Sequence, residues 1–292
     1  MAQTIAQRKI EAFYLNVLIG DDPLADYSLL EPLLLDGAPH SLSAHNRYFA
    51  FHFERHGDAI LSVSYEGDPD AEALLYDTAS GEERLGEKRR SEIVATRTHF
   101  AFNLAARVVA FEYNQRGTKV RDFEDLLQLR VAAQTGREDV QISIVPIPGP
   151  RFLAQLEEFE RIQSAKAVLV RPNAGWLDGN SPLFRYGVES NAQTMTLEAK
   201  AGRAEGLSRR HGIVADVRQV VRRGVTTVRE AIFWGTKEGR RQELKLSSQT
   251  LKTVVQLKRL DDGQPDRSAM RHYVLQFCQV VSTTRPAGQE DR

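Results

Sequence analysis

The sequence predicts an α+β protein in which an N-terminal antiparallel β-rich domain precedes a mixed α+β domain with a basic surface. Hydrophobic and polar residues alternate through much of residues 1–115, and near Thr118 the period changes from two to about 3.6. From residue 140 onward the chain has the pattern of strand, helix and strand. Residues 198–260 hold 15 Lys and Arg against 6 Asp and Glu, a net charge of +9.

The first half is predicted to be mostly antiparallel sheet. Residues 10–19 form a strongly apolar strand, and residues 48–65 alternate on both sides of a turn, which is typical of a β-hairpin. Alternation returns in residues 99–115. A helix with Thr118 as N-cap and Gly136 at its end then follows.

The second half is predicted to mix helices and strands. A strand at residues 140–147 leads through a helix to a second strand at residues 165–171, and a basic helix begins near Ile213. Residues 225–234 and 242–248 alternate as a hairpin with a basic tip, and a last apolar stripe ends near Val281. The predicted division is a β-rich domain (1–117), a connecting helix (118–137), a basic domain (138–282) and a flexible tail (283–292).

Composition limits the possible functions. No apolar run approaches the roughly 18 residues of a membrane span, so membrane insertion is not expected. The N-terminus has no apolar signal region, and the single cysteine, Cys278, lies on the last apolar stripe as a buried thiol. A cytoplasmic protein is expected. Because there is no Walker A loop, G-x-G-x-x-G or nucleophile elbow, no cofactor is predicted.

The basic stretch predicts a surface for phosphates. The total charge is zero, but residues 1–150 carry −8 and residues 151–292 carry +8. Convergent Lys and Arg side chains would bind double-stranded DNA without sequence preference. The candidates are Arg209, Arg210, Arg218, Arg222, Arg223, Arg229, Arg240, Arg241, Lys245, Lys252, Lys258 and Arg259.

The helix that begins near Ile213 is expected to expose Arg218, Arg222 and Arg223 opposite its apolar stripe. A second interpretation of the charge pattern stays open. The basic face could pair with the acidic half of a neighbouring copy and produce a homo-oligomer, most simply a dimer.

Two weaker patterns suggest a metal site. Glu243-Leu244-Lys245 has the Glu-x-Lys spacing of a metal-dependent nuclease strand, with Glu230 as the nearest upstream acid. Separately, His52, Glu54 and His56 occupy alternate positions of the first hairpin and would point to one side of it. Alternating charge on exposed strands produces both patterns without any metal.

The order of the elements adds a resemblance. The phrase FEYNQRGTKVRDFEDLL leads from strand to helix, and QISIVPIPGPRFLAQLEEFERIQSAKAVLVRP supplies a strand, a helix and a strand. With the N-terminal hairpins and the basic second half, this layout resembles a bacterial phage-defence family known as a domain of unknown function. It is more distantly similar to the phage-exclusion protein RexA and to the DNA-binding component of the Kiwa defence system. The resemblance implies a non-catalytic, dimeric DNA-binding protein that acts in phage defence with a partner protein, and it transfers no site residue.

Overall fold

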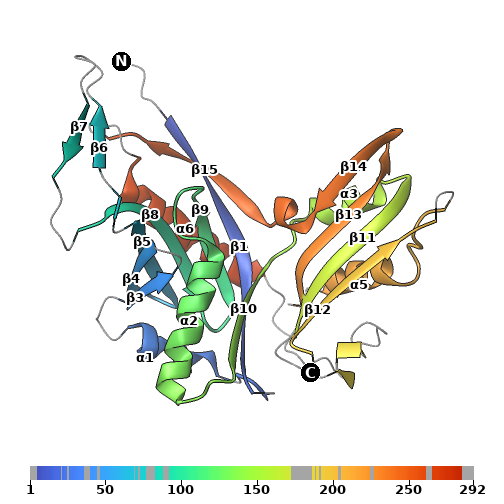
Figure 1. Cartoon of the computed structure of the whole chain (residues 1–292), viewed down its shortest axis with the longest axis horizontal. Coiled ribbons are helices and arrows are strands. Elements are labelled where there is room, and N and C mark those ends of the chain that lie inside the picture. The colour runs from blue at the N-terminus through green and yellow to red at the C-terminus, as the bar shows by residue number, and fades with distance from the viewer. Residues whose placement is uncertain are drawn as a thin grey trace.

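The computed structural model has a large and a small antiparallel sheet with helices packed against them (Figure 1). The predicted α+β class is confirmed. The described residues are 5–20, 22–24, 26–35, 40–44, 47–68, 70–71, 73–76, 83–87, 92–171, 186–187, 189–190, 192–202, 205–223, 227–260 and 265–284.

Strand β1 (Ile5–Ile19) is the centre of the large sheet. The strands run in the order β10–β1–β9–β8–β5–β4–β3, and β2 and β15 also pair with β1. Each of these pairings is antiparallel. The bounds are β2 (Asp22–Pro23), β3 (His40–Ala44), β4 (Arg47–His56), β5 (Ala59–Asp68), β8 (Val94–Asn103), β9 (Val108–Tyr113), β10 (Val140–Pro146) and β15 (Lys252–Lys258).

The predicted first hairpin is confirmed as β4 and β5. His56 pairs with Ala59, and Gly57 between them has a φ of +59°, a conformation that favours glycine. A separate short hairpin, β6 (Ala73–Tyr76) with β7 (Glu83–Gly86), branches off between β5 and β8.

Helix α2 (Val120–Thr135) covers one face of the large sheet. Phe123 from this helix packs on Phe100 of β8 with ring centroids 4.4 Å apart, among other buried phenylalanines. The predicted helix is confirmed and ends at Gly136, whose φ is +64°. The N-cap is Lys119 rather than Thr118, because Thr118 is buried and precedes the first turn. A 3-10 turn, η1 (Tyr27–Leu30), and the short helix α1 (Glu31–Leu34) lie on the same face.

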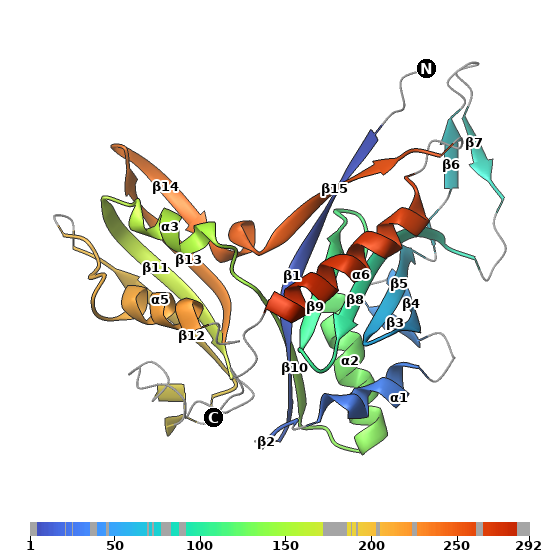
Figure 2. The same cartoon turned by 180° about the vertical axis from the view of Figure 1, so that it is seen from behind.

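Helix α6 (Arg267–Thr284) covers the opposite face, as Figure 2 shows. Its Val274 and Cys278 pack near the small side chains of Ala101 and Ala110. The predicted buried thiol is confirmed, and burial raises the pKa of Cys278 to about 12. The helix extends two residues into the expected tail, and residues 285–292 lie outside the described residues. No helix in the described part of the chain is long and apolar enough to cross a membrane.

Strands β10 and β15 follow one another along the same edge of β1. Phe13 pairs with Pro146 at the end of β10, and Glu11 pairs with Lys252 at the start of β15. Only Ala12 separates these two pairings. Its N–H donates to the carbonyl of Leu251, and its carbonyl accepts from the N–H of Ile147. The chain between β10 and β15 is therefore an insertion into one edge of the large sheet.

Two hydrogen-bonded linkers connect this insertion, residues 148–250, to the large sheet. The Gly149 N–H donates to the carbonyl of Gln249 at 2.6 Å, and the Leu251 N–H donates to the carbonyl of Ile147 at 2.7 Å. A Cβ atom at Gly149 would lie 2.7 Å from the carbonyl oxygen of Gln249. Glycine therefore permits the close approach of the two linkers.

The predicted boundaries differ from this division. The expected basic domain, residues 138–282, contains β10 and β15, which are strands of the large sheet, and α6, which packs on that sheet. The reason is that β10 and β15 pair with β1, which is at the far end of the chain. The local spacing of hydrophobic residues does not show which distant strands pair. The insertion has a net charge of +6 and the remaining residues have −6, so the charge asymmetry follows the two parts.

The small sheet has the order β12–β11–β13–β14. The β13–β14 hairpin was predicted, and its turn is shorter than expected, at Glu238 and Gly239. Helices α3 and α5 pack on one face, and in Figure 1 the other face is turned toward the viewer. The bounds are β11 (Arg161–Val170), β12 (Thr194–Lys200), β13 (Val228–Lys237), β14 (Arg240–Lys245), α3 (Arg151–Glu157), α5 (Ile213–Arg223) and the 3-10 turn η3 (Leu246–Gln249).

Candidate nucleic-acid interface

Helix α5 has a buried face and an exposed face. The buried face packs on the small sheet through Ile213, Val214, Val217 and Val220. Ala215, Arg218, Gln219 and Arg222 follow the spacing i, i+3, i+4 and i+7 and lie on the other side. The predicted amphipathic helix is confirmed.

Four arginines of the predicted set line one groove beside α5. Arg218 and Arg222 come from the helix, and Arg209 and Arg210 come from the loop before it. The groove is open to solvent, has a volume of about 410 Å³, and its remaining lining residues are Ala215 and Gln219. We call this surface the arginine groove. No acidic side chain lines it in the described part of the chain.

Glu157, at the end of α3, lies beside the groove and pairs with three of its arginines. The Glu157 carboxylate is 3.6 Å from Nη1 of Arg209 and 3.7 Å from Nη2 of Arg222, and it accepts a hydrogen bond from Nη2 of Arg218. The Glu157 carbonyl also accepts from Nη1 of Arg209 at 3.0 Å. One carboxylate therefore holds three guanidinium groups together.

The arginines differ in how freely they reach solvent. The side chain of Arg222 is 60% exposed, whereas that of Arg218 is only 20% exposed and also donates to the carbonyl of Arg209. The expectation that Arg218 stands free on an exposed helix face is therefore wrong, because Glu157 draws it toward α3. Arg210 is exposed. The side chain of Arg223 lies outside the described residues.

The other predicted cations lie away from the groove. Arg229 of β13 donates to Glu124 of α2 at 2.8 Å, and this ion pair joins the insertion to the large sheet. Burial raises the pKa of Glu124 even though Arg229 opposes the shift. Lys245 lies 2.5 Å from Glu243 on β14. Neither cation is available to the surface that α5 presents.

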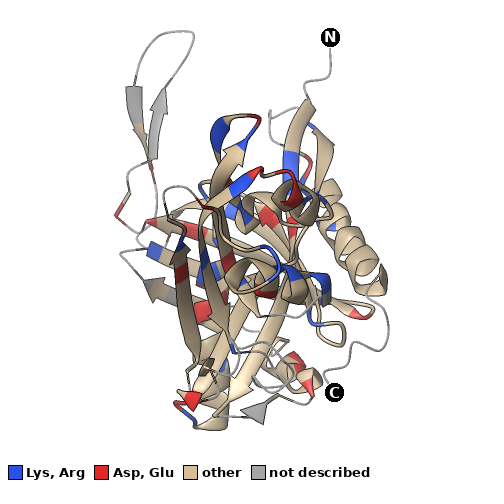
Figure 3. Cartoon of the chain, turned by 90° about the vertical axis from the view of Figure 1, so that its right-hand side faces the viewer, with Lys and Arg blue, Asp and Glu red and all other residues tan. Residues whose placement is uncertain are grey.

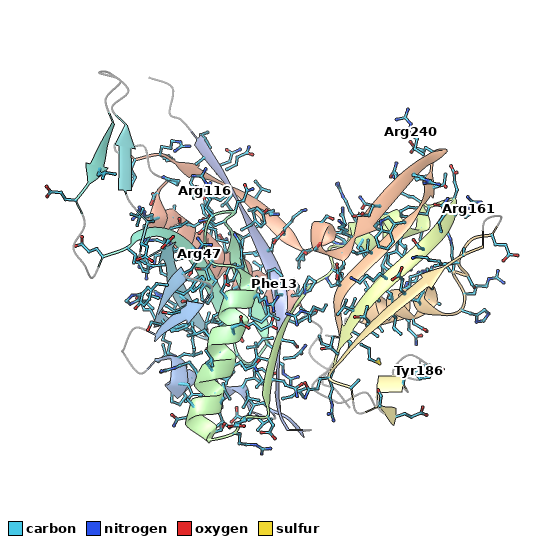
Figure 4. All side chains as sticks on the ribbon, in the orientation of Figure 1. Phe13, Arg47, Arg116, Arg161, Tyr186 and Arg240 are labelled. Atoms are coloured by element: carbon cyan, nitrogen blue, oxygen red, sulfur yellow. The ribbon has the colours of Figure 1, made fainter. Side chains whose placement is uncertain are left out.

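The remaining candidates divide between two further places. Arg240 and Arg241 begin β14 at the hairpin tip, and Figure 4 shows Arg240 pointing outward from it. Lys252 and Lys258 lie on β15 of the large sheet, followed by Arg259. Figure 3, which views the molecule from the side of the small sheet, shows Lys and Arg at several separate places with Asp and Glu between them. The basic stretch of the sequence thus forms several surfaces.

The nuclease arrangement is not assembled. Glu243 pairs in register with Trp234 and accepts a hydrogen bond from its indole N–H at 3.0 Å. Glu230 lies four residues from Trp234 along β13, about 13 Å at roughly 3.3 Å per residue, and it is 3.7 Å from Lys166. Within the described ranges there is no group of three His, Cys, Asp or Glu that could hold a metal ion.

His52, Glu54 and His56 share the face of β4 that lies toward α6. The ring of His52 contacts Tyr65 edge to face, with centroids 5.6 Å apart. Glu54 lies 3.1 Å from Nε2 of His56 and forms an ion pair with Arg271 of α6. The described geometry assigns Glu54 to these pairs rather than to a metal.

Glu157 was not predicted from the sequence, although it organises the arginine groove. It lies 52 to 65 residues before its arginine partners, and no local pattern of charge marks it. Only the packing of α3 beside α5 on the small sheet brings them together. A search for acids that follow an apolar helix stripe would find Glu157 and Glu158 without distinguishing them.

Comparison with protein-family models and with curated proteins finds no match to this chain. The fold and the groove define an α+β protein with a domain inserted at a sheet edge and a cluster of arginines on that domain. The phage-defence resemblance of the sequence stays a prediction.

Proposed function

We propose that this chain is a non-catalytic protein that binds double-stranded DNA through phosphate contacts from the arginine groove. The observation that supports the proposal is the convergence of Arg209, Arg210, Arg218 and Arg222 around one open groove. Guanidinium groups match phosphate oxygens in a two-pronged geometry, and phosphate contacts carry no base information. Binding is therefore expected to be independent of sequence.

The four arginines set the expected salt dependence. Each phosphate contact contributes about 0.9 to the slope of log K against log salt, so four contacts give a slope of about −3.6. Between about 50 and 200 mM salt the affinity should fall about 150-fold. This is weaker than the dependence that all twelve predicted cations would produce on one surface.

The test is duplex binding measured over this salt range with two matched double variants. Arg210→Ala/Arg222→Ala removes two exposed groove cations, and the fall in affinity should shrink to about 12-fold. Lys252→Ala/Lys258→Ala removes two cations from β15 and should leave the slope unchanged. Equal effects of the two variants would show that charge anywhere on the chain suffices and would refute the groove.

Self-association of oppositely charged parts is the competing explanation, since the insertion carries +6 and the rest carries −6. Light scattering at low salt separates the two. If Arg210→Ala/Arg222→Ala reduces the assembly size while DNA affinity stays constant, the arginines serve an interface between copies. In the DNA proposal, affinity falls and the oligomer size does not change.

A role in phage defence, with a partner protein, extends the proposal and is supported by the resemblance of the sequence. It predicts that phage form fewer plaques on bacteria that express the chain with its partner than on bacteria that express the Arg210→Ala/Arg222→Ala variant with the same partner at the same level. Equal plaque counts, with the variant deficient in DNA binding, would separate DNA binding from defence.

A further inference from the structure

A second basic site lies on the large sheet, beneath the first turns of α6. Two adjoining clefts of about 490 and 500 Å³ share Tyr65, Arg97, His99 and Arg267 as lining residues. Figure 2 shows α6 crossing this face of the sheet. We call the combined site the basic cleft, and its arginines are Arg8, Arg97, Arg116, Arg267 and Arg271.

The alternation of β5 and β8 places the polar side chains in the basic cleft. Leu61 pairs with Ala101, and both are buried in the core beneath α6. On the same face, Val63 lies two residues after Leu61 and pairs with His99, and Tyr65 lies four residues after Leu61 and pairs with Arg97. The apolar cover of the sheet therefore gives way to a polar row where α6 begins. The guanidinium of Arg97 lies over the Tyr65 ring, 5.0 Å from its centroid.

His99 forms the buried floor of the basic cleft. It is 4% exposed, and a carboxylate oxygen of Glu112 lies 3.0 Å from its backbone N–H and 2.8 Å from its Nδ1. An ionised carboxylate only accepts hydrogen bonds, so Nδ1 carries the proton. Nε2 then has no hydrogen-bond partner among the described residues. His99 lines both clefts, whereas Glu112 lines only one of them.

Cations exceed anions around His99. In the described part of the chain Arg97, Arg116 and Arg267 have no carboxylate partner. Arg8 shares Glu112 at 3.5 Å. The other acid of the lining, Asp266, accepts the first N–H groups of α6 from Ser268 and Ala269 at 3.0 and 3.1 Å. Arginines without carboxylate partners, beside a buried imidazole nitrogen without a hydrogen-bond partner, favour the binding of an anion.

We propose that the basic cleft binds a small ligand that carries a phosphate monoester. Arg97, Arg116 and Arg267 supply charged donors from β8, the loop after β9 and α6. A phosphate monoester that keeps one proton has an O–H group, which can donate a hydrogen bond to an acceptor such as Nε2 of His99. The volume suits a molecule of mononucleotide size.

The basic cleft is separate from the arginine groove. The cleft belongs to the large sheet and α6, whereas the groove belongs to the insertion and α5. They share no lining residue. A ligand in the cleft therefore does not depend on the proposed DNA contacts, and each proposal can fail alone.

The test is titration calorimetry of the full chain with adenosine monophosphate and with inorganic phosphate. Adenosine, which has no phosphate, and sulfate, which carries no exchangeable proton near neutral pH, are the comparison ligands. Both phosphates should bind, adenosine should not, and sulfate should bind more weakly than inorganic phosphate because it has no O–H group to donate to Nε2 of His99. Absence of binding by both phosphates at millimolar concentration would overturn the proposal, and equal binding of phosphate and sulfate would remove His99 from it.

Three single variants locate the site. Arg116→Ala and Arg267→Ala change exposed side chains and should each weaken binding of adenosine monophosphate about tenfold. Arg240→Ala, at the tip of β14, removes an exposed arginine elsewhere and should have no effect. If the two cleft variants instead weaken duplex binding and leave adenosine monophosphate unchanged, the cleft holds nucleic acid and the small-ligand proposal is wrong.

Discussion

Replacing Glu157 with Gln should increase the affinity of the arginine groove for DNA. Glu157 is the carboxylate that contacts Arg209, Arg218 and Arg222, so it competes with a phosphate for the same donors. Glutamine has nearly the same shape and keeps an oxygen that accepts hydrogen bonds. The substitution therefore removes the competing charge with little change in packing, and its expected effect is opposite to that of a simple loss of structure.

The size of the effect follows from the distance. Two acceptors bridged by one guanidinium group are separated by about 6 Å, and Glu157 is 41% exposed. At an effective dielectric constant between about 40 and 80, the repulsion between two unit charges at about 6 Å is about 0.7 to 1.4 kcal/mol. The affinity for DNA should therefore rise about three- to tenfold at low salt, and the gain should shrink as salt screens the charges.

The assay is fluorescence anisotropy with a labelled duplex at about 50 and 200 mM salt, conditions chosen from the expected salt dependence. Glu198→Gln on β12 is the matched control. It also removes one carboxylate from the insertion, and Glu198 lies 3.0 Å from Lys200, away from the groove. An equal gain in both variants would show that total charge decides the affinity. A loss of affinity in Glu157→Gln would refute the competition and show that Glu157 is needed to hold the arginines in place.

Three further outcomes test the fold. Gly149→Ala should lower the free energy of unfolding by about 1 to 3 kcal/mol, because the new Cβ would lie 2.7 Å from the carbonyl oxygen of Gln249. Gly202→Ala is the control, since a Cβ at Gly202 has open space and should change stability little. Urea unfolding measures both variants. Burial raises the pKa of Glu66, so its contribution to stability is present below its ordinary pKa of 4.5 and is lost as the pH rises through the folded value. Glu66→Gln should therefore reduce the loss of stability expected as the pH rises above 4.5, measured by urea unfolding across pH. Cys278 should react with a thiol reagent only after unfolding, and reaction of the native protein at pH 8 would contradict its burial.

Local periodicity predicts much of this fold because it depends on neighbours in sequence. The hairpin of β4 and β5, helix α2 and the apolar stripes of α5 and α6 all follow from alternation or helical spacing, and all are present. Each element needs a buried face, and that requirement is written in a few consecutive residues. The same logic correctly places Cys278 in the core.

The domain division could not be predicted in this way. Only the register of β1 shows that β10 and β15 belong to one edge, since Ala12 alone separates the pairing of Phe13 with Pro146 from that of Glu11 with Lys252. These contacts join residues far apart in the sequence, and both partners look like ordinary strands. An insertion between two collinear strands leaves no compositional boundary at its ends.

Only part of the candidate site could be predicted from the sequence, because local spacing shows which residues share a helix face but not where distant elements lie. Helical spacing brings Arg218 and Arg222 to one face, and the preceding loop adds Arg209 and Arg210. Other candidates lie on strands: Arg240 and Arg241 are at the tip of the β13–β14 hairpin, and Lys252 and Lys258 are on β15 of the large sheet. Arg229 reaches Glu124 on α2, the helix that packs on the large sheet, instead of the groove.

The net charge of a segment is a poor guide to where an anion binds. Residues 198–260 carry +9, but Glu157 pairs with three of their arginines and Glu124 with a fourth. Residues 1–150 carry −8, but they contribute Arg97 and Arg116, which have no carboxylate partner among the described residues. Charges at 3 to 4 Å interact strongly, whereas exposed charges beyond about 10 Å are largely screened in physiological salt. An anion therefore responds to the unpaired arginines within a few ångströms, and by that measure the proposed basic cleft, to which the acidic half of the sequence contributes Arg97 and Arg116, is at least as favourable as the basic stretch.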